Sequence, residues 1–450
     1  MTGEHYLAKR AQHCTRRAFT RWSVAVAGGV FAACRERLGP QEQRLNTDFR
    51  GPADLQWWII GGETAIDILT REIIEPYRRE RPQISVTIVS HGDWNDHFTK
   101  LQTALAGGVP PDIARMKDYW IVDFVTRDAL TELDAFIVAD KLDLKARHGE
   151  GRLESTRVGG KTYALPFTTL TLNEFYNEDL LKQFGFVAGA EVRPPTTWEE
   201  RREYARRMVD RDRGQWGYRN YSFDPSQSST VEWMELLWQN GGEFLSKDLS
   251  RFVFNTAEGV EALQYIVDLI WKDQVAPAPG VPVPGGPASG KIALWNGGCW
   301  DIPSYRKNRP DFNFGVAIKP AKKSATVMIQ GNNLAMFRES KQREAAWTLM
   351  RFMNREESDL AWNAQGGYLP VALANFEKPP FSTDPAWQMV IKQYRRQDTR
   401  PMPITVSYQE IINAIGAELR AAYENKKPVK DALADAQRQA QDILDRARKR

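Results

Sequence analysis

The chain has 450 residues, with 61 Lys and Arg against 57 Asp and Glu and a formal net charge of +4. Residues 1–33 contain five of the bases and one of the acids, so the rest of the chain carries 56 of each. This balance gives no reason to expect nucleic acid or an anionic membrane surface as a partner. The length is sufficient for two domains with their own cores, and three cysteines do not indicate a disulfide framework.

The first 33 residues have the pattern of an export signal. Basic residues precede an apolar run of 12 residues, which is shorter than the ~20 residues that span a membrane. TRRAF (15–19) resembles a twin-arginine motif and FAAC (31–34) resembles a lipobox. We therefore predict a signal at 1–33, a lipid on Cys34 and a tether at 34–52. The protein would be exported and either anchored to the outer face of the cytoplasmic membrane or periplasmic. A chance basic pair beside an ordinary cysteine is the open alternative, and the choice between the twin-arginine and general export routes is open too.

After the tether, strand and helix patterns alternate. Apolar or alternating runs at 55–60, 84–89 and 110–113 predict strands, and the first of them is typical of a strand buried on both faces. Apolar residues at helical spacing lie between these runs, most clearly from about 94 to 106. This order predicts an α/β fold with a largely parallel sheet, whose ligand-accessible loops follow the carboxyl ends of the strands.

Beyond Pro166 the pattern changes to long amphipathic helices with few strands between them. Proline-rich residues 275–289 predict an irregular loop, and residues 312–318 predict a strand. The predicted helices cover residues 199–209, 229–239, 256–271, 341–354 and 430–448. Trp233, Trp238, Trp271, Trp347 and Trp362 lie on apolar helical stripes and are predicted to be core. Arg201, Arg202, Arg206 and Arg207 are interpreted as a solvated helix face, because acidic residues alternate with them.

Several segments carry a family resemblance because they occur together and in a fixed order. They are LTREIIEPYRRERPQISVTIV, KLQTALAGGVPPDIARM, VGGKTYALPFTT, GKIALWNGGCW, NFGVAIKP, SKQREAAWTLMRFMN and GGYLPV. From about Leu55 to the C-terminus the chain resembles the extracellular solute-binding proteins of ABC importers, in the sugar class that includes maltose-binding protein. DALTELD at 128–134 departs from the usual GALTELD of that family.

The resemblance implies an α/β fold of two lobes, joined by crossover strands and closing on a ligand held in the cleft between them. Carried onto this chain, it places the crossings near 165–167, 316–318 and 367–370. The implied bounds are 53–166 plus 318–368 for lobe one, and 167–317 plus 369–450 for lobe two. The implied function is to bind a carbohydrate and deliver it, chemically unchanged, to the permease subunits of an ABC transporter. We expect a monomer that uses no cofactor.

A sugar presents weakly apolar ring faces and many hydroxyls, so its binding site needs aromatic side chains and polar hydrogen-bonding groups. The leading candidate is Trp300, since the resemblance places a sugar-stacking Trp there and Gly297-Gly298 permits close approach of backbone. The other candidates follow predicted strands or match family positions. They are Glu63, Thr64, Asp93, Trp94, Asp118, Tyr119, Trp120, Thr168, Thr169, Tyr221, Phe223, Asn332, Asn333 and Tyr408. Packing and surface roles are the alternative for each, and Thr64 could instead cap a helix.

Two further functions have to be weighed. A binding protein for glycerol-3-phosphate or a glycerophosphodiester would need a cation at the site, for which Arg115 and Lys117 are available. A surface polysaccharide hydrolase is less favoured, because no carboxylate pair has glycosidase spacing. His91 and His97 are not spaced to share a helix face and no second cluster completes a metal shell, so we predict no metal site. Cys299 has no catalytic partner in sequence and is interpreted as an inert buried thiol.

Replacing Cys34 by Ala tests the lipid anchor. The variant is expected to appear in the medium or in the soluble envelope fraction, because it lacks the thiol that would carry the diacylglyceryl group. Fractionation and incorporation of radiolabelled lipid measure the outcome, and labelling that persists in the variant would refute the lipobox assignment.

Overall fold

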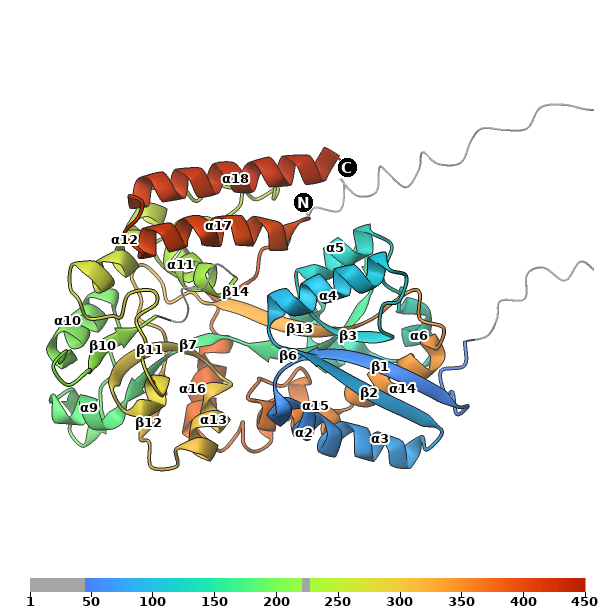
Figure 1. Ribbon diagram of the computed structural model, residues 1–450. Helices are drawn as coiled ribbons and strands as arrows, with labels where there is room; N and C mark the ends of the chain where they lie inside the picture. Colours follow the sequence, from blue (N-terminus) through green and yellow to red (C-terminus); the bar gives the residue numbers. More distant parts are fainter. Residues whose placement is uncertain (1–44, 221–226, 450) are drawn as a thin grey trace, which may run out of the picture.

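The computed structural model describes residues 45–220 and 227–449 (Figure 1). These residues form two lobes, each built on its own β-sheet with helices packed around it. The α/β, two-lobed class predicted from the sequence is confirmed. The predicted signal at 1–33 and Cys34 lie outside the described residues.

The sheet of lobe one has the order β14-β13-β3-β1-β2, and β6 also pairs with β13. Its strands are β1 (Ala53–Ile60), β2 (Ile84–His91), β3 (Ile113–Lys117), β6 (Ala164–Leu170), β13 (Met328–Met336) and β14 (Arg400–Pro401). β1 is parallel to β2 and β3, whereas β13 is antiparallel to β3 and β6. The sheet is therefore mixed rather than largely parallel, because β13 arrives from lobe two and runs against β3.

β1 shows what the apolar pattern did not reveal. Leu55, Trp57 and Ile59 are buried, whereas the residues between them are exposed or half-buried. The strand is thus buried on one face, not on both as predicted.

The helices of lobe one are α2 (Glu63–Leu69), α3 (Glu75–Glu80), α4 (Trp94–Ala106), α5 (Trp120–Thr126), α6 (Asp134–Ala139), α7 (Leu144–His148), α8 (Glu150–Leu153), α14 (Arg343–Met353) and α15 (Glu356–Gly366), with a π-helical turn at Thr70–Ile74.

Lobe two contains a smaller sheet of order β10-β11-β7-β12. Its strands are β7 (Leu172–Asn177), β10 (Trp216–Arg219), β11 (Ile292–Gly298) and β12 (Phe314–Ala317). Its helices are α9 (Glu178–Gln183), α10 (Trp198–Met208), α11 (Gln227–Gln239), α12 (Ala257–Trp271), α13 (Asp301–Asn308), α16 (Pro385–Tyr394), α17 (Tyr408–Tyr423) and α18 (Val429–Lys449). The described residues also form two short hairpins and several 3-10 turns. The hairpins are β4/β5 (Arg157–Val158 and Lys161–Thr162) and β8/β9 (Val187–Ala188 and Glu191–Val192). The 3-10 turns are at Glu154–Thr156, Gly286–Ser289 and Leu373–Glu377.

The chain passes between the two sheets at four places. β6 and β7 are separated only by Thr171, and residues 318–327 connect β12 to β13. Thr169 and Leu369 exchange two backbone hydrogen bonds, 3.2 and 2.8 Å long, beside the first crossing. β14 returns from lobe two to pair with β13. The sheet changes a few residues after the predicted first crossing, and the predicted lobe bounds stay a prediction.

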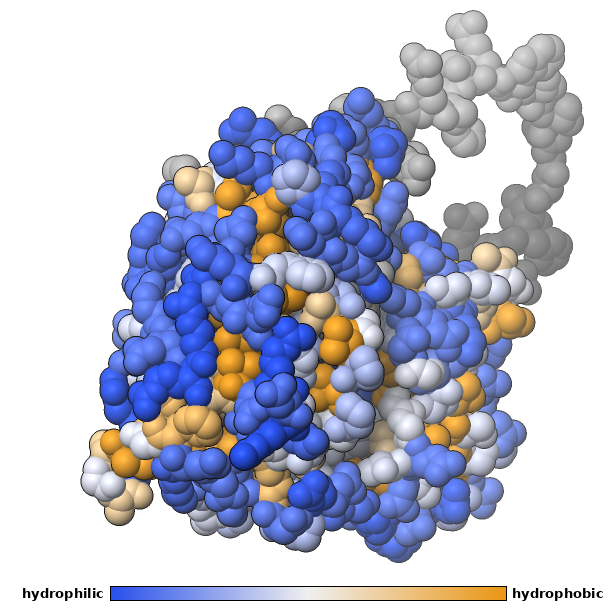
Figure 2. All heavy atoms as spheres, turned by 60° about the vertical axis from the view of Figure 1, so that its left-hand side comes forward, coloured by the Kyte–Doolittle hydropathy of each residue, from blue (hydrophilic) through white to orange (hydrophobic). Residues whose placement is uncertain are grey.

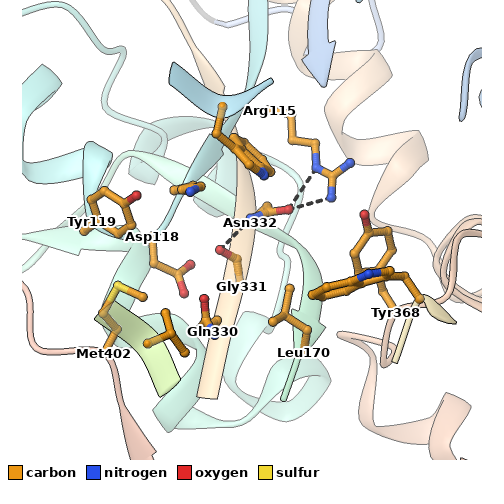
Figure 3. A pocket seen from close by; sticks show the side chains of 13 residues that line it. Arg115, Asp118, Tyr119, Leu170, Gln330, Gly331, Asn332, Tyr368 and Met402 are labelled. Carbon is orange, nitrogen blue, oxygen red and sulfur yellow. Dashed lines mark hydrogen bonds between the residues drawn. The ribbon is translucent and has the colours of Figure 1, made fainter. Parts of the chain in front are cut away.

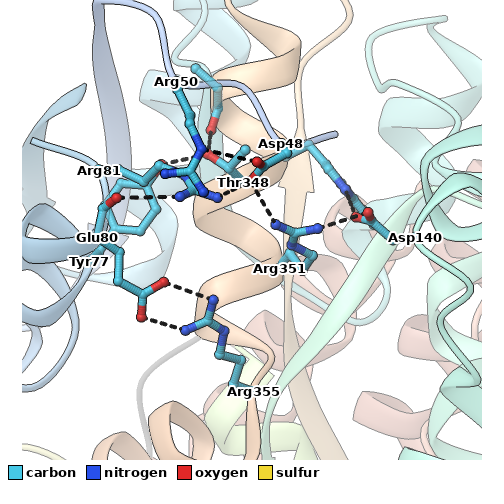
Figure 4. Close-up of polar contacts among 11 residues, drawn as sticks. Asp48, Arg50, Tyr77, Glu80, Arg81, Asp140, Thr348, Arg351 and Arg355 are labelled. Atoms are coloured by element: carbon cyan, nitrogen blue, oxygen red, sulfur yellow. Dashed lines mark hydrogen bonds and ion pairs between the residues drawn. The ribbon is translucent and has the colours of Figure 1, made fainter. Parts of the chain in front are cut away.

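Residues 45–52, which we predicted as part of the tether, contact lobe one (Figure 4). Leu45 and Phe49 pack against its core, and Asp48 forms ion pairs with Arg50 and Arg81. On the same side of the lobe Arg355 binds Glu80 through two hydrogen bonds of 2.7 and 3.0 Å. The fold therefore begins several residues earlier than predicted.

The face of lobe two that comes forward in Figure 2 is mostly hydrophilic, with hydrophobic side chains gathered in small patches. Across the described ranges, every helix is too short or too polar to span a membrane.

Two buried ion pairs anchor helices of lobe two, one to the second crossing and one to the sheet of the lobe. Lys319, in the second crossing, places its Nζ 2.5 Å from Glu235 Oε2, and Glu235 Oε1 accepts a hydrogen bond from the N–H of Met328. Arg201 Nη1 lies 3.3 Å from Glu174 Oε2, with both side chains almost fully buried. The solvated-face interpretation is therefore wrong for Arg201, which points from α10 towards the sheet.

Glu235→Gln is expected to lower the free energy of unfolding by about 3–5 kcal/mol, because it leaves the buried Lys319 ammonium without its carboxylate partner. Glu243→Gln is the matched control. Glu243 pairs with Arg400 at the surface, with both side chains exposed, and its loss should cost at most about 1 kcal/mol. Denaturant unfolding measures both, and equal losses in the two variants would contradict the role given to the buried pair.

Candidate functional site

A cavity of about 210 Å³ lies between the lobes (Figure 3). Residues from both lobes and from the crossing segments line it: Trp94, Arg115, Lys117, Asp118, Tyr119, Leu170, Val231, Trp300, Gln330, Gly331, Asn332, Tyr368 and Met402. Most come from the carboxyl end of β3, the start of α4 and the middle of β13. This is the edge of an α/β sheet at which ligands are expected to bind.

Aromatic side chains form the apolar part of the wall. Trp300 and Tyr368 approach each other with ring centroids 6.4 Å apart, and Trp94 and Tyr119 contribute further rings. Two glycines make room for Trp300. A Cβ on Gly298 would lie 2.2 Å from its ring, and one on Gly367, whose φ is +78°, would lie 2.4 Å from its Cα. Gly298 of the WNGGCW segment and Gly367 of the GGY segment thus leave the space that Trp300 occupies.

Two cations, Arg115 and Lys117, line the cavity from the same side of β3, since residues two apart in a strand face the same way. Arg115 donates from Nε and Nη2 to Asn332 Oδ1, at 2.9 and 2.6 Å (Figure 3). The rings of Tyr368, Trp94, Trp362 and Phe167 surround its guanidinium at 4.9 to 5.8 Å. Lys117 Nζ lies 4.9 Å from the centroid of the Trp94 ring. The arginine is therefore fixed in place by neutral groups.

Asp118 contributes a carboxylate to the wall, and a network behind the cavity holds it. Its Oδ1 accepts hydrogen bonds from Arg152 Nη1 at 3.1 Å, Ser155 Oγ at 3.1 Å and Asn333 Nδ2 at 2.9 Å. Arg152 is buried and also donates to the carbonyls of Thr168 and Asn332, to Thr169 Oγ1 and to Asn333 Oδ1. A Cβ on Gly331 would lie 2.2 Å from Arg152 Nη2, so glycine is required there.

The structure brings five of the predicted site residues to this cavity: Trp94, Asp118, Tyr119, Trp300 and Asn332. Five more lie directly behind its wall. Thr168, Thr169 and Asn333 are bound to Arg152, while Trp120 and Tyr408 are buried against Tyr119. Their side chains are almost fully buried, so they position other groups.

Three predicted residues lie away from the cavity wall. Glu63 and Thr64 are exposed in the first turn of α2, whose N-cap is Gly62, so Thr64 is not the cap. Asp93 is exposed and caps α4, accepting from the N–H groups of Asn95 and Asp96 at 2.8 and 2.9 Å. Tyr221 and Phe223 lie outside the described residues.

The chain matches the model of the bacterial extracellular solute-binding protein family over residues 62–359. The chain belongs to this family. Membership of an extracellular family implies that the protein is exported. A Brucella abortus protein described as a binding protein is 23% identical over 384 residues, covering 83% of this chain and 89% of the relative.

Solved structures of solute-binding proteins share the fold. A Listeria monocytogenes ABC substrate-binding protein in complex with cycloalternan matches with a TM-score of 0.78 and 20% identity, covering 88% of this chain and 99% of the other. The cyclic alpha-maltosyl-1,6-maltose binding protein of Arthrobacter globiformis is 25% identical and matches with a TM-score of 0.71. The match covers 88% of this chain and 100% of the other. A Mycobacterium tuberculosis protein in complex with glycerophosphocholine matches with a TM-score of 0.76 and 20% identity. The match covers 88% of this chain and 99% of the other.

Sequence reasoning missed several groups of this solute-binding protein's cavity. Tyr368 follows Gly367 within the predicted third crossing, and an aromatic residue beside a crossing was the available signal. Arg115 and Lys117 were considered only for a phosphate ligand. Leu170, Val231, Gln330, Gly331 and Met402 had no distinguishing pattern.

The reactive groups considered from sequence are held in uncharged or unreactive forms. Burial raises the pKa of the Cys299 thiol to about 12, so the nucleophilic thiolate is strongly disfavoured at neutral pH. Burial lowers the pKa of His97 to about 4, and its Nδ1 lies 2.6 Å from the Nδ1 of His91. His97 Nε2 lies 2.9 Å from the carbonyl oxygen of Arg115, so this histidine pair supports β3 from behind the site.

The first turn of α17 joins lobe two to lobe one behind Tyr119. Gln409 Oε1 accepts from Trp120 Nε1 at 2.9 Å and from the Tyr119 hydroxyl at 3.2 Å. Asp123 Oδ1 accepts from the N–H of Ser407 at 2.6 Å. Burial raises the pKa of Asp123 from 3.8 to about 6, although the Ser407 hydrogen bond and Arg127 act in the opposite direction.

The raised pKa of Asp123 predicts a pH-dependent stability. Between about pH 4 and 6 the folded protein keeps a proton that the unfolded chain releases, so rising pH stabilises the unfolded chain. The free energy of unfolding of wild type minus that of Asp123→Asn should fall by about 2 kcal/mol from pH 4 to pH 7. Denaturant unfolding at the two pH values measures this difference. A difference that rises with pH would show that the hydrogen bond from Ser407 outweighs burial.

Proposed function

We propose that this solute-binding protein captures a carbohydrate in the cavity between its lobes and delivers it, chemically unchanged, to the permease subunits of an ABC importer. The observation that carries the proposal is the lining of the cavity. Four aromatic side chains alternate there with amide, carboxylate and cationic groups. Aromatic rings suit the apolar faces of a sugar, and the polar groups suit its hydroxyls.

The roles of the individual groups follow from their chemistry. Trp300 and Tyr368 would stack on sugar faces, and Trp94 and Tyr119 would close the opposite side. Asp118 accepts hydrogen bonds from hydroxyls, while Asn332 and Gln330 have both donors and acceptors. The sugar-bound neighbours from Listeria and Arthrobacter support this assignment as members of the same structural class.

Binding would favour closure of the two lobes. Trp300 follows β11 of lobe two, whereas Trp94 and Asp118 belong to lobe one. A ligand that contacts both lobes at once binds the closed arrangement more tightly than the open one, and so shifts the population towards it. The permease can then distinguish loaded from empty protein by its shape.

The lining favours binding over hydrolysis. Retaining and inverting glycosidases place two carboxyl groups on either side of the scissile bond. Asp118 is the one carboxylate among the described residues that line the cavity, and it is already bound to Arg152. The site as described therefore lacks the pair that a hydrolase needs, and we propose that the protein performs no chemistry.

A glycerol-3-phosphate or glycerophosphodiester ligand is the second candidate. It needs a cation for the phosphate, and Arg115 and Lys117 line the cavity. The neighbour bound to glycerophosphocholine has the same fold. The carbohydrate remains the preferred ligand because aromatic rings supply much of the wall.

The remaining proposals concern location and assembly. We propose a monomer held on the outer face of the cytoplasmic membrane through a lipid on Cys34, after export guided by residues 1–33. The resemblance of those residues to a twin-arginine signal with a lipobox supports the anchor, and the extracellular family supports export.

Trp300→Ala should reduce the affinity for the bound sugar roughly tenfold or more, because it removes a stacking face from the wall. Isothermal titration calorimetry with mono- and oligosaccharides measures the loss. Trp271→Ala is the control, because Trp271 is 43% exposed on α12 and does not line the cavity. Equal affinity in wild type and Trp300→Ala would remove Trp300 from the site. If no saccharide binds while another solute does, or if new reducing ends appear, the proposed function is wrong.

A further inference from the structure

The electrical charge of the cavity wall indicates more about the ligand than its aromatic rings do. Among the described residues, the lining includes the cation Arg115 and the anion Asp118. Arg115 is buried, with 2% of its surface exposed. Taking a charge out of water is unfavourable unless another charge or a strong hydrogen-bond network compensates it.

Asp118 does not balance the charge of Arg115, because Arg152 already neutralises it. The Arg152 guanidinium lies 3.1 Å from Asp118, and both side chains are almost fully buried. Ser155 and Asn333 donate further hydrogen bonds to the same carboxylate oxygen. Together Arg152 and Asp118 add no net charge to the wall.

Among the residues that the structure describes, Arg115 is bound by neutral groups only. Its Nε and Nη2 share the amide oxygen of Asn332, and Nη1 makes a long contact of 3.4 Å with the carbonyl of Ile60. Within the described part of the chain, no carboxylate lies within ion-pair distance of it. The four rings around it attract the cation but carry no net charge. The positive charge of Arg115 is therefore uncompensated at the cavity.

We infer that the ligand is an anion: a hydroxyl-rich solute with an acid group, bound by Arg115 with Lys117 beside it. This inference rests on the proposed function and specifies its ligand. The acid group is either the carboxylate of a uronic-acid saccharide or the phosphate of a sugar or polyol ester. Both offer oxygens that accept charge-assisted hydrogen bonds from a guanidinium. The aromatic walls then hold the sugar or polyol carbons of the same molecule.

Matched ligands tested on the unaltered protein decide the question. Calorimetry compares D-galacturonate with D-galactose and D-glucuronate with D-glucose, and compares digalacturonate with its carboxyl-reduced form. Glycerol 3-phosphate and glycerophosphocholine form the phosphate arm, with glycerol as the neutral partner. We expect an acid ligand to bind at least about tenfold more tightly than its neutral partner, with the preference reduced as salt rises from 20 mM to about 500 mM.

The outcomes separate this inference from the proposed function. Tighter binding of an acidic saccharide supports both. Binding of a neutral sugar equally well or better overturns the anion inference and leaves the carbohydrate proposal standing. Binding of the phosphate esters alone supports the anion and overturns the carbohydrate. Binding of none of these compounds, with binding of an unrelated neutral solute, overturns both.

Variants of Arg115 then test whether its positive charge is the one that binds the acid group. Arg115→Gln should lose at least about tenfold in affinity for the acid ligand and change its affinity for a neutral partner less than about threefold. Arg115→Lys keeps the charge and should fall between Arg115→Gln and wild type. Arg355→Gln is the control, because it removes an equal charge from an exposed ion pair with Glu80, away from the cavity lining.

Circular dichroism shows whether Arg115→Gln is folded. If it is not, Arg115→Lys and the matched ligands still test whether the protein binds an anion through Arg115. Equal losses for acid and neutral ligands in Arg115→Gln would show that Arg115 only shapes the wall, and would overturn the inference.

Discussion

The buried guanidinium of Arg152 holds together the parts of the chain that make the binding site. It donates to the backbone of β6 and β13, where the chain crosses between the lobes, and to Asp118 at the end of β3. A buried arginine has to satisfy its donors within the protein, so these segments cannot shift without leaving a charge unpaired. Gly331 is required because any side chain there would occupy the space of Arg152 Nη2. The cavity wall and the crossing strands are therefore one unit, and movement of the lobes has to occur around it rather than through it.

This arrangement separates two electrostatic tasks. The pair of Arg152 and Asp118 is structural and electrically balanced, and the hydrogen bonds to Oδ1 fix the orientation of the carboxylate. Arg115, in contrast, is fixed by an amide and by aromatic rings, none of which neutralises it. Under our proposal, a wall of this kind would select ligands by shape through the rings and by charge through the cation. It contains fixed hydrogen-bonding groups and none of the paired carboxylates or activated nucleophiles that bond cleavage would need among its described residues.

The sequence predicts what depends on local patterns. α4 begins and ends where its apolar spacing indicates, and the order of strands and helices leads to the two-lobed class. The predictions fail where the answer depends on distant partners. Arg201 looks like its exposed neighbours on α10, yet Glu174 on β7 draws it into the core. Trp271 fits an apolar stripe and was predicted to be core, but it is the last residue of α12 and is 43% exposed. Arg152 had no local signature, since its role arises only when β6, β13 and the end of β3 come together.

A crystal structure of the protein with the saccharide that it binds most tightly tests the central claim most directly. The account predicts an intact saccharide between the lobes, stacked on Trp300 and Tyr368 and hydrogen-bonded to Asp118 and Asn332, with contacts to both lobes. A saccharide bound at another surface, held by one lobe alone, or found cleaved would contradict it.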